Sequence, residues 1–191
     1  DMRAFMEDAA KAFAEGAPPH HHLVFKAHPF EDGRDGLEKW LDQLAEQYGL
    51  TGRVHFLEGE RLAVLLDNAQ SAVTVNSTAA QQALWRNLPL WACGKAVYNR
   101  PALVSDQPLA AFFKAPPRPD HKAYLAFRRA LLMTSQVPGG FYTRSGRRAL
   151  IRALPPLMMA RADRYSTLFS ADHRGAKVTD EKVLPFRQHQ S

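Results

Sequence analysis

Three small polar side chains, Asn76, Ser77 and Thr78, stand where an apolar alternating run gives way to helix-forming residues. A helix that begins at Thr78 or Ala79 presents unpaired backbone N–H groups and a partial positive charge, which suit a phosphate. The small side chains let an anion approach the backbone, and the Ser77 and Thr78 hydroxyls add hydrogen-bond donors. These residue types are also preferred helix caps. The stretch therefore predicts either a phosphate cradle or a helix cap.

A second polar stretch, from Lys26 to Pro29, follows another apolar run. A protonated or N–H-donating His28 in this stretch would complete a phosphate cage from a neighbouring loop. Ligands of open parallel sheets bind outside the carboxyl ends of the strands, so two strand ends of one sheet would bring both stretches together. A lone His-Pro at a strand end is also a common structural feature. The pairing of the two stretches favours the binding hypothesis.

The elements that would position these residues alternate regularly along the chain. The spacing of apolar residues predicts helices over 2–15, 37–48, 61–69 and 78–87. Short apolar runs predict strands over 23–29, 53–57, 71–76 and 88–93. This alternation implies right-handed crossovers. It predicts an α/β fold with a parallel, doubly wound sheet flanked by helices.

The C-terminal part of the chain has a different pattern. Beyond residue 105 no strand is predicted, and helices are expected over 121–135 and 145–154. After Pro155 and Pro156 we expect loosely ordered structure. The expected domains are a Rossmann-like lobe over 1–115, a helical extension packing on it over 116–160, and a basic, loosely ordered tail over 161–191.

Charge is unevenly distributed between these parts. Residues 1–117 hold 11 Lys and Arg against 14 Asp and Glu, a net of −3, whereas residues 118–191 hold 14 against 5, a net of +9. A basic segment favours nucleic acid, anionic lipid or phosphorylated ligands as partners. Arg128, Arg129, Arg147 and Arg148 are candidates for a basic face. A solvated arginine-rich helical surface is the alternative.

The cellular compartment is constrained by what the sequence lacks. The single cysteine, Cys93, excludes an intramolecular disulfide framework and favours a reducing compartment. It falls in an apolar run, which predicts a buried side chain. No run approaches the roughly 18 apolar residues of a membrane span, and residues 1–15 carry acids unlike a signal peptide. We expect a cytoplasmic protein and interpret the start at Asp1 as a processed product or a domain of a longer chain.

Several blocks of the chain resemble the capsule polysaccharide biosynthesis and export family, in particular its β-Kdo transferases. The matching blocks are VFKAHPF (24–30), VTVNSTAAQQAL (73–84), LPLWACGKAVYNRPAL (88–103) and FRRALLMTSQVPGGFY (127–142). They follow the family's order and approximate spacing over residues 20–142. The last block is the most diagnostic, because Rossmann-like lobes in general have no reason to carry it.

The resemblance implies a GT-B glycosyltransferase in which this chain is the C-terminal, nucleotide-sugar-binding lobe with a helical extension. The donor would be CMP-Kdo, no cofactor is implied, and the acceptor would be a lipid-linked glycan held by a missing N-terminal lobe. By analogy with similar CMP-sugar transferases, His28 would contact the donor phosphate and stabilise the departing CMP. Ser77 and Thr78 would hold the same phosphate. Lys26, Pro29 and Asn76 complete the expected donor site.

The same resemblance implies what this chain lacks. The acidic residue that acts on the sugar should lie in the N-terminal lobe, so the chain alone is expected to bind donor and turn over little. The chain also departs from the family pattern, with Ala79-Ala80 in place of an expected glycine and Asn99 near an expected acid. Peripheral association with the anionic inner membrane is the expected location.

Other function classes are not favoured. Adjacent histidines at His20, His21 and His22 point in alternating directions on an extended chain, and no carboxylate or cysteine has ligand spacing, so no metal is predicted. No P-loop motif is present. No stacking platform for bases is visible, which argues against nucleic acid as a partner. Two alternatives remain: a GT-B enzyme using another nucleotide-sugar, and a non-catalytic basic domain that binds anionic lipid.

Overall fold

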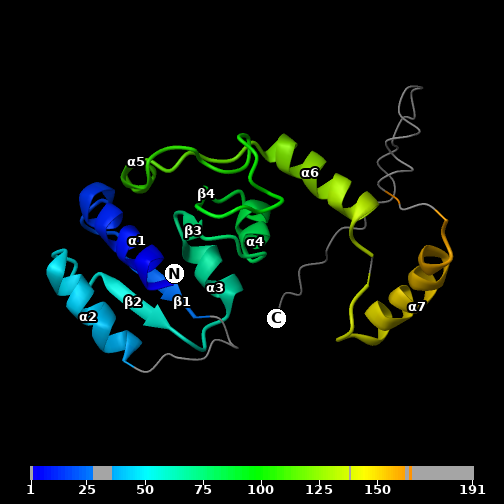
Figure 1. Cartoon of the computed structure of the whole chain (residues 1–191), viewed down its shortest axis with the longest axis horizontal. Helices are drawn as coiled ribbons and strands as arrows, with labels where there is room; N and C mark the ends of the chain where they lie inside the picture. The colour runs from blue at the N-terminus through cyan, green and yellow to red at the C-terminus, as the bar shows by residue number, and fades with distance from the viewer. Residues whose placement is uncertain (1, 28–35, 138, 162–163, 165–191) are drawn as a thin grey trace. The chain divides into compact units, whose positions relative to one another are not determined.

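The computed structural model describes residues 2–27, 36–137, 139–161 and 164 (Figure 1). The chain divides into two compact units, residues 1–127 and 128–191. None of the described helices is long and apolar enough to cross a membrane.

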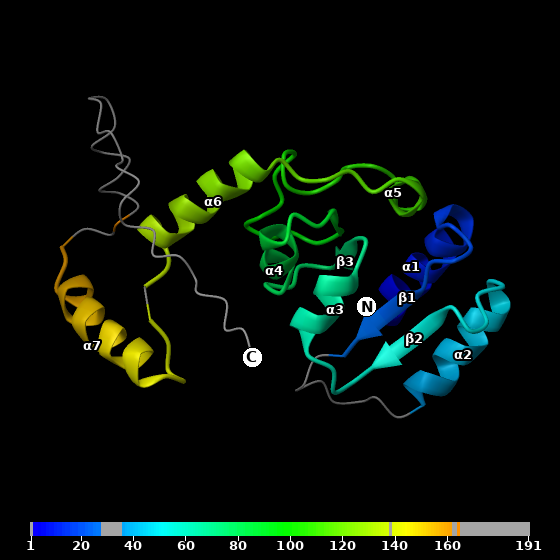
Figure 2. The same cartoon turned by 180° about the vertical axis from the view of Figure 1, so that it is seen from behind.

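The first four elements of the first unit form a βαβ arrangement preceded by a helix. They are α1 (Met2–Gly16), β1 (Leu23–Lys26), α2 (Leu37–Gln47) and β2 (Val54–Leu57). The two strands are parallel, with Leu23 opposite Val54 and Lys26 opposite Leu57, and lie side by side in Figure 2. Because parallel neighbours need a crossover connection, α2 and its flanking loops bring the chain back to start β2 beside β1.

A second parallel pair follows with the same alternation. Its elements are α3 (Leu62–Asn68), β3 (Ala72–Thr74), α4 (Ala80–Trp85) and β4 (Leu90–Ala92). Ala72 lies opposite Leu90 and Thr74 opposite Ala92. The alternating α/β order predicted from the sequence is therefore confirmed.

The single sheet expected from the sequence is divided into two parallel pairs among the described residues, β1 with β2 and β3 with β4. The described strands are shorter than the apolar runs that predicted them. Strands of three or four residues offer few ladder hydrogen bonds, so the pairs are united by side-chain packing. Val73 of β3 and Trp91 of β4 pack against the core formed around β1 and β2.

Two apolar clusters hold the first unit together. One is built from α1, β1, α2 and a helix that the sequence pattern did not predict, α5 (Leu109–Lys114). Phe112 and Phe113 of α5 are buried, and Phe113 meets Phe13 of α1 edge to face at 5.2 Å between ring centroids. The second cluster gathers Ala80, Leu84, Leu90, Tyr98, Leu103 and Tyr124.

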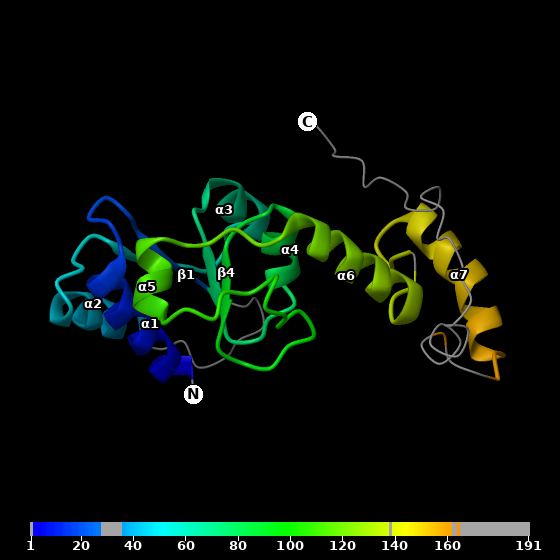
Figure 3. The same ribbon diagram turned by 90° about the horizontal axis from the view of Figure 1, so that it is seen from above.

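The contact between α1 and α5 depends on a glycine. A Cβ added at Gly16 would overlap the carbonyl oxygen of Ala110, so only glycine allows the end of α1 to approach α5 this closely (Figure 3).

The loop after α1 is fixed by Arg53, whose guanidinium donates to the carbonyls of Pro18 at 2.9 Å and His21 at 3.0 Å. The same group lies over the Phe13 ring at 5.0 Å.

Two longer helices complete the described chain, α6 (His121–Thr134) and α7 (Arg144–Met158). The second of these helices was expected over 145–154, but α7 continues through Pro155 and Pro156 to Met158. Each proline lacks the N–H that would bond to the carbonyl four residues earlier, so the two prolines weaken the last turn of α7 without ending the helix. The Met159 N–H closes the helix on the Pro155 carbonyl at 3.1 Å.

Candidate functional site

The Asn76-Ser77-Thr78 stretch forms a turn between β3 and α4, and all three side chains are exposed. The Ser77 N–H donates to the Thr74 hydroxyl at 3.2 Å, and the Ser77 hydroxyl accepts from the Ala79 N–H at 3.2 Å. Among the described residues neither hydroxyl donates a hydrogen bond, so each has a hydrogen to offer another acceptor. The turn thus presents small polar groups to solvent while its backbone is fixed by local hydrogen bonds.

The turn is also held from its buried side by Tyr98. The Tyr98 hydroxyl donates to the Ser77 carbonyl at 2.7 Å, and only 1% of the tyrosine is exposed. Burial raises the pKa of the Tyr98 phenol above its ordinary value of 10.0, so it remains a donor over the physiological range. Tyr98 therefore connects the apolar core to the backbone of the exposed turn.

A glycine and an asparagine complete this support. The Gly94 N–H donates to the Val75 carbonyl at 2.7 Å, and the Asn99 side-chain amide donates to the Gly94 carbonyl at 2.6 Å. A Cβ at Gly94 would lie 2.8 Å from the Val75 oxygen and 3.2 Å from Cβ of Asn76. The loop after β4 can approach the loop after β3 only because residue 94 is glycine.

The start of α4 differs from the sequence expectation. The helix begins at Ala80, not at Thr78 or Ala79, and the Ala80 N–H is taken by the Ser77 carbonyl at 3.1 Å. Ser77 thus supplies two acceptors for N–H groups that were expected to be unpaired. Among the described residues, the Thr78 N–H has no hydrogen-bond partner. In this state the stretch acts as a helix cap, and its capacity to donate rests mainly on hydroxyls and the Asn76 amide.

Lys26, at the end of β1, has a defined position. Its ammonium group donates to the carbonyls of Ala27 and Glu58, each at 2.8 Å, and so bridges the ends of β1 and β2. Lys26 ends a strand of one sheet and the turn at Asn76 follows a strand of the other, so the expectation that both stretches lie at strand ends of a single sheet was wrong. No hydrogen bond or ion pair joins them within the described ranges. His28 and Pro29 lie outside the described residues.

The histidine that precedes β1 pairs with a histidine of β2. His22 and His55 stack at 5.1 Å between ring centroids and share a 2.8 Å hydrogen bond, next to the first residues of β1 and β2. In the part of the chain that the structure describes, no three His, Cys, Asp or Glu side chains gather as metal ligands would. The expectation that Cys93 is buried was wrong: its side chain is exposed, and it comes directly after β4, which ends at Ala92.

A small hollow of about 200 Å³ exists in the second unit. It is lined by Thr134, Ser135, Gln136, Val137, Leu157, Ala160 and Arg164. None of the predicted site residues lines it. The hollow therefore does not bear on the donor site.

Sequence reasoning missed the residues that support the turn, Tyr98, Gly94 and Asn99. Their signal was present as the Gly-x-Ala-x-Tyr-Asn pattern of residues 94–99, which contributed to the family resemblance but was given no structural role. The local pattern does not indicate that the Tyr98 hydroxyl forms a hydrogen bond with Ser77, which lies 21 residues earlier.

Comparison with known proteins gives the family. Residues 1–142 match the family described as capsule polysaccharide biosynthesis protein. This chain belongs to that family. The prediction made from residues 20–142 is thus confirmed, and the match extends to the N-terminal helix α1.

Curated relatives in the family point the same way. The chain is 33% identical over 142 residues to the capsule polysaccharide export protein KpsS of Escherichia coli, covering 74% of this chain and 36% of that protein. It is 32% identical over 145 residues to the capsule polysaccharide modification protein LipB of Neisseria meningitidis serogroup A, covering 74% of this chain and 34% of LipB. The chain thus matches only about a third of the length of these relatives. No solved structure matches the chain.

Proposed function

We propose that this chain is the donor-binding lobe of a capsule polysaccharide glycosyltransferase, which transfers Kdo from CMP-Kdo to a lipid-linked acceptor. Membership of the capsule polysaccharide biosynthesis family supports the pathway. The structural observation that carries the proposal is the turn of Asn76, Ser77 and Thr78. It exposes three small polar side chains on a backbone fixed by Tyr98.

Transfer of a sugar from a CMP donor breaks the bond between the anomeric carbon and the phosphate oxygen, and negative charge grows on the phosphate. Donors that are already oriented stabilise this charge without reorganising during the reaction. In the proposal, the Ser77 and Thr78 hydroxyls, the Asn76 amide and the Thr78 N–H point at the phosphate. The backbone restraints from Tyr98 and Gly94 keep these donors in position.

Lys26 and His28 have different roles in the proposal. Lys26 holds the end of β1 beside β2 through its two carbonyl contacts, and its third N–H can meet the phosphate. His28, two residues later, donates to the departing CMP, and Pro29 restricts the backbone that follows it. The acid or base that acts on the sugar and acceptor is proposed to come from a second lobe.

An alternative to the proposal is that the lobe binds a nucleotide-sugar other than CMP-Kdo. A GT-B enzyme of another specificity would present similar donors to the phosphates of UDP or another nucleotide. The two enzymes differ in which base the lobe accepts. A comparison of CMP with UDP therefore separates them.

The test is a thermal-shift titration of the whole chain with CMP and with UDP. A ligand at about 100 times its dissociation constant stabilises a protein by about 2.7 kcal/mol, which corresponds to several degrees for a chain of this size. We expect a CMP-selective shift that Ser77→Ala and His28→Ala each reduce by more than half. Ser145→Ala and His20→Ala, at exposed positions outside the proposed site, serve as matched controls and should leave the shift unchanged.

Three outcomes would contradict parts of this proposal. A shift selective for UDP would assign a different donor. No shift with either nucleotide would leave the turn as a helix cap and remove the donor site. Transfer of Kdo by this chain alone would show that a second lobe is not required.

A further inference from the structure

The second unit carries a helix that has little of its own to pack against. No residue of α7 is buried, and none of the described residues from 128 onward is buried. A 15-residue helix is only marginally stable in water without tertiary contacts. Its exposed apolar residues therefore need a surface to cover them.

The helix does have one face that is partly covered within the unit. Gly146, Ala149, Leu150, Ala153 and Leu157 are half-buried and follow helical spacing. A Cβ at Gly139 would lie 2.7 Å from the Gly146 carbonyl oxygen and 2.7 Å from the Leu150 side chain, so the glycine loop before α7 packs on this face. The opposite face is the one left open.

The open face combines arginines with large apolar side chains. Arg144, Arg147, Arg148, Ile151, Arg152, Leu154 and Met158 are all exposed on α7 at spacings of one, three or four residues. Ile151 is 70% exposed and Met158 81%. The arginines occupy mostly the first two turns and the apolar residues the last two.

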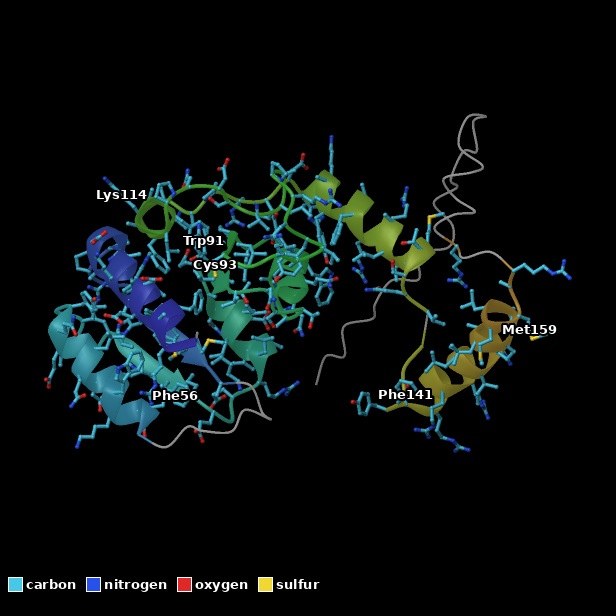
Figure 4. All side chains as sticks on the ribbon, in the orientation of Figure 1. Phe56, Trp91, Cys93, Lys114, Phe141 and Met159 are labelled. Carbon is cyan, nitrogen blue, oxygen red and sulfur yellow. The ribbon has the colours of Figure 1, made fainter. Side chains whose placement is uncertain are left out.

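Further apolar side chains extend this face at both ends of the helix. Phe141 is 74% exposed before the first turn, and Met159 is 83% exposed after the last (Figure 4). The Arg147 guanidinium donates to the Phe141 carbonyl at 2.9 Å, which fixes Phe141 beside the start of α7. The Thr143 hydroxyl caps the helix by accepting from the Gly146 N–H at 3.0 Å. The exposed apolar residues are thus held on one defined helical segment.

The charge of this part of the chain is of one sign. Residues 121–162 contain eight Lys and Arg and no Asp or Glu. A protein partner would have to supply matching acids, whereas the anionic surface of a bilayer supplies negative charge throughout. Exposed apolar side chains have no role in binding the phosphate backbone of a nucleic acid. Helices that lie on a membrane surface bury such side chains at the boundary between headgroups and acyl chains.

We propose that α7, with Phe141 and Met159 at its ends, docks on the surface of an anionic phospholipid bilayer. The helix lies in the plane of the membrane. Arg144, Arg148 and Arg152 contact lipid phosphates, and Ile151 and Met158 enter the region below them. Because α7 begins after residue 142, the last residue of the family match, the proposal concerns a segment outside that match. The proposal is independent of the donor site.

The test is flotation of the whole chain with lipid vesicles. One set contains about 30 mol% phosphatidylglycerol in phosphatidylcholine, and the other is phosphatidylcholine alone. We expect binding to the anionic vesicles only, and its loss at about 0.5 M salt, because the Debye length shortens. Binding that is equal for the two compositions would overturn the proposal.

Two variants separate the contributions of charge and apolar contact. The substitutions Arg144→Gln, Arg148→Gln and Arg152→Gln together should weaken anionic binding on the order of 100-fold. Arg147 is left in place because it holds Phe141. The pair Ile151→Gln and Met158→Gln should weaken binding at least about tenfold.

Matched controls use exposed positions of the first unit. Lys11→Gln, Lys39→Gln and Lys114→Gln remove the same charge, and Val64→Gln with Leu125→Gln removes comparable apolar surface. Neither set should change binding by more than about twofold on the surface-potential argument. Equal losses in the control sets would show that net charge or non-specific hydrophobic contact drives binding, and would overturn the proposal.

Other occupants of the face give distinct results. A concentration-dependent dimer that Ile151→Gln and Met158→Gln abolish, without vesicle binding, would show that a second copy covers α7. Binding to single-stranded RNA that survives the apolar substitutions, again without vesicle binding, would show a nucleic-acid surface. The thermal shift with CMP should be the same in every α7 variant, which distinguishes failure here from failure of the donor site.

Discussion

The Tyr98 hydroxyl donates a 2.7 Å hydrogen bond to the carbonyl oxygen of Ser77. One end of this bond lies in an apolar cluster with Leu84 and Leu90, and the other lies in an exposed turn. The bond links the stability of the core to the position of side chains that we propose to bind a nucleotide phosphate. Two of the predictions below follow from it.

Substitution Tyr98→Phe should lower stability and nucleotide affinity together. It removes the hydrogen bond to the Ser77 carbonyl, which still accepts from the Ala80 N–H, at a cost of about 1 kcal/mol. That corresponds to about 2–4 °C in the unfolding temperature. Tyr142→Phe is the control, because Tyr142 is 96% exposed. Unfolding curves and CMP titrations check both effects, and identical midpoints for the two variants would contradict the structural role of Tyr98.

Stability should fall as the pH rises above about 10, in part because of Tyr98. Burial raises the pKa of the Tyr98 phenol above its ordinary value of 10.0 in the folded chain. The unfolded chain then loses its proton first and binds fewer protons, so the free energy of unfolding decreases with pH in this range. Below pH 10 the contribution is fully present.

The pH prediction is checked by denaturant unfolding from pH 8 to pH 11. The pKa of Tyr48 is also raised, first by desolvation and then by the nearby Glu7 carboxylate. The comparison therefore uses a Tyr48→Phe background, so that Tyr48 does not titrate in the same pH range. In that background, the stability difference between the parent and its Tyr98→Phe variant should shrink as the pH rises past 10. A difference that stays constant would argue against a raised pKa at Tyr98.

Substitution Asn99→Asp should loosen the support of the same turn. The Asn99 amide donates to the Gly94 carbonyl at 2.6 Å, and an ionised carboxylate has no hydrogen to donate. The expected loss is about 1 kcal/mol, with part of it recovered at acidic pH, where the carboxyl is protonated. Asn68→Asp removes a similar amide-to-carbonyl bond, which joins Asn68 to Val64 within α3 and does not support the turn. Asn99→Asp should weaken CMP binding and Asn68→Asp should not; equal effects would exclude a specific role for Asn99.

Substitution Gly16→Ala should be among the most destabilising single changes in the first unit. The added Cβ would overlap the Ala110 carbonyl, and a backbone atom can move away only if α5 shifts from α1. Overpacking of this kind costs about 1–3 kcal/mol. Gly59→Ala is the control, since nothing lies within 4 Å of a Cβ at that position. If both alanine variants unfold at the same temperature, the close contact between α1 and α5 does not exist in solution.

Substitution Lys26→Met separates structural from ligand-binding roles of this lysine. Methionine keeps an apolar stem but removes the contacts to the carbonyls of Ala27 and Glu58, which should cost about 1–2 kcal/mol. If Lys26 also meets the donor phosphate, CMP affinity should fall by at least about tenfold, since one charge-assisted hydrogen bond contributes about 1.5–3 kcal/mol. Lys26→Arg keeps the charge and should retain most of the affinity. An affinity unchanged in Lys26→Met would leave the lysine as a link between β1 and β2 alone.

Local pattern was enough to determine the order of helices and strands in the first unit. The spacing of apolar residues in α1 and α2, and the short apolar runs of β1 to β4, are properties of neighbouring residues, so the sequence expresses them directly. The family also followed from sequence, because its blocks are read residue by residue. Helix α5 was missed because its six residues are too short for a clear period.

Only the tertiary structure decided how the candidate site is supported. Ser77 and its local use as a cap were both open to prediction from sequence, but its bond to Tyr98 depends on residues 21 positions apart meeting in space. The same holds for Gly94 against Val75 and for Gly16 against Ala110, where the constraint on one residue is set by a backbone atom distant in sequence. Periodicity reports which face of an element is apolar, whereas close approach between elements depends on packing that no local window contains. The sequence thus determined the elements and the family, and packing determined which side chains hold the turn.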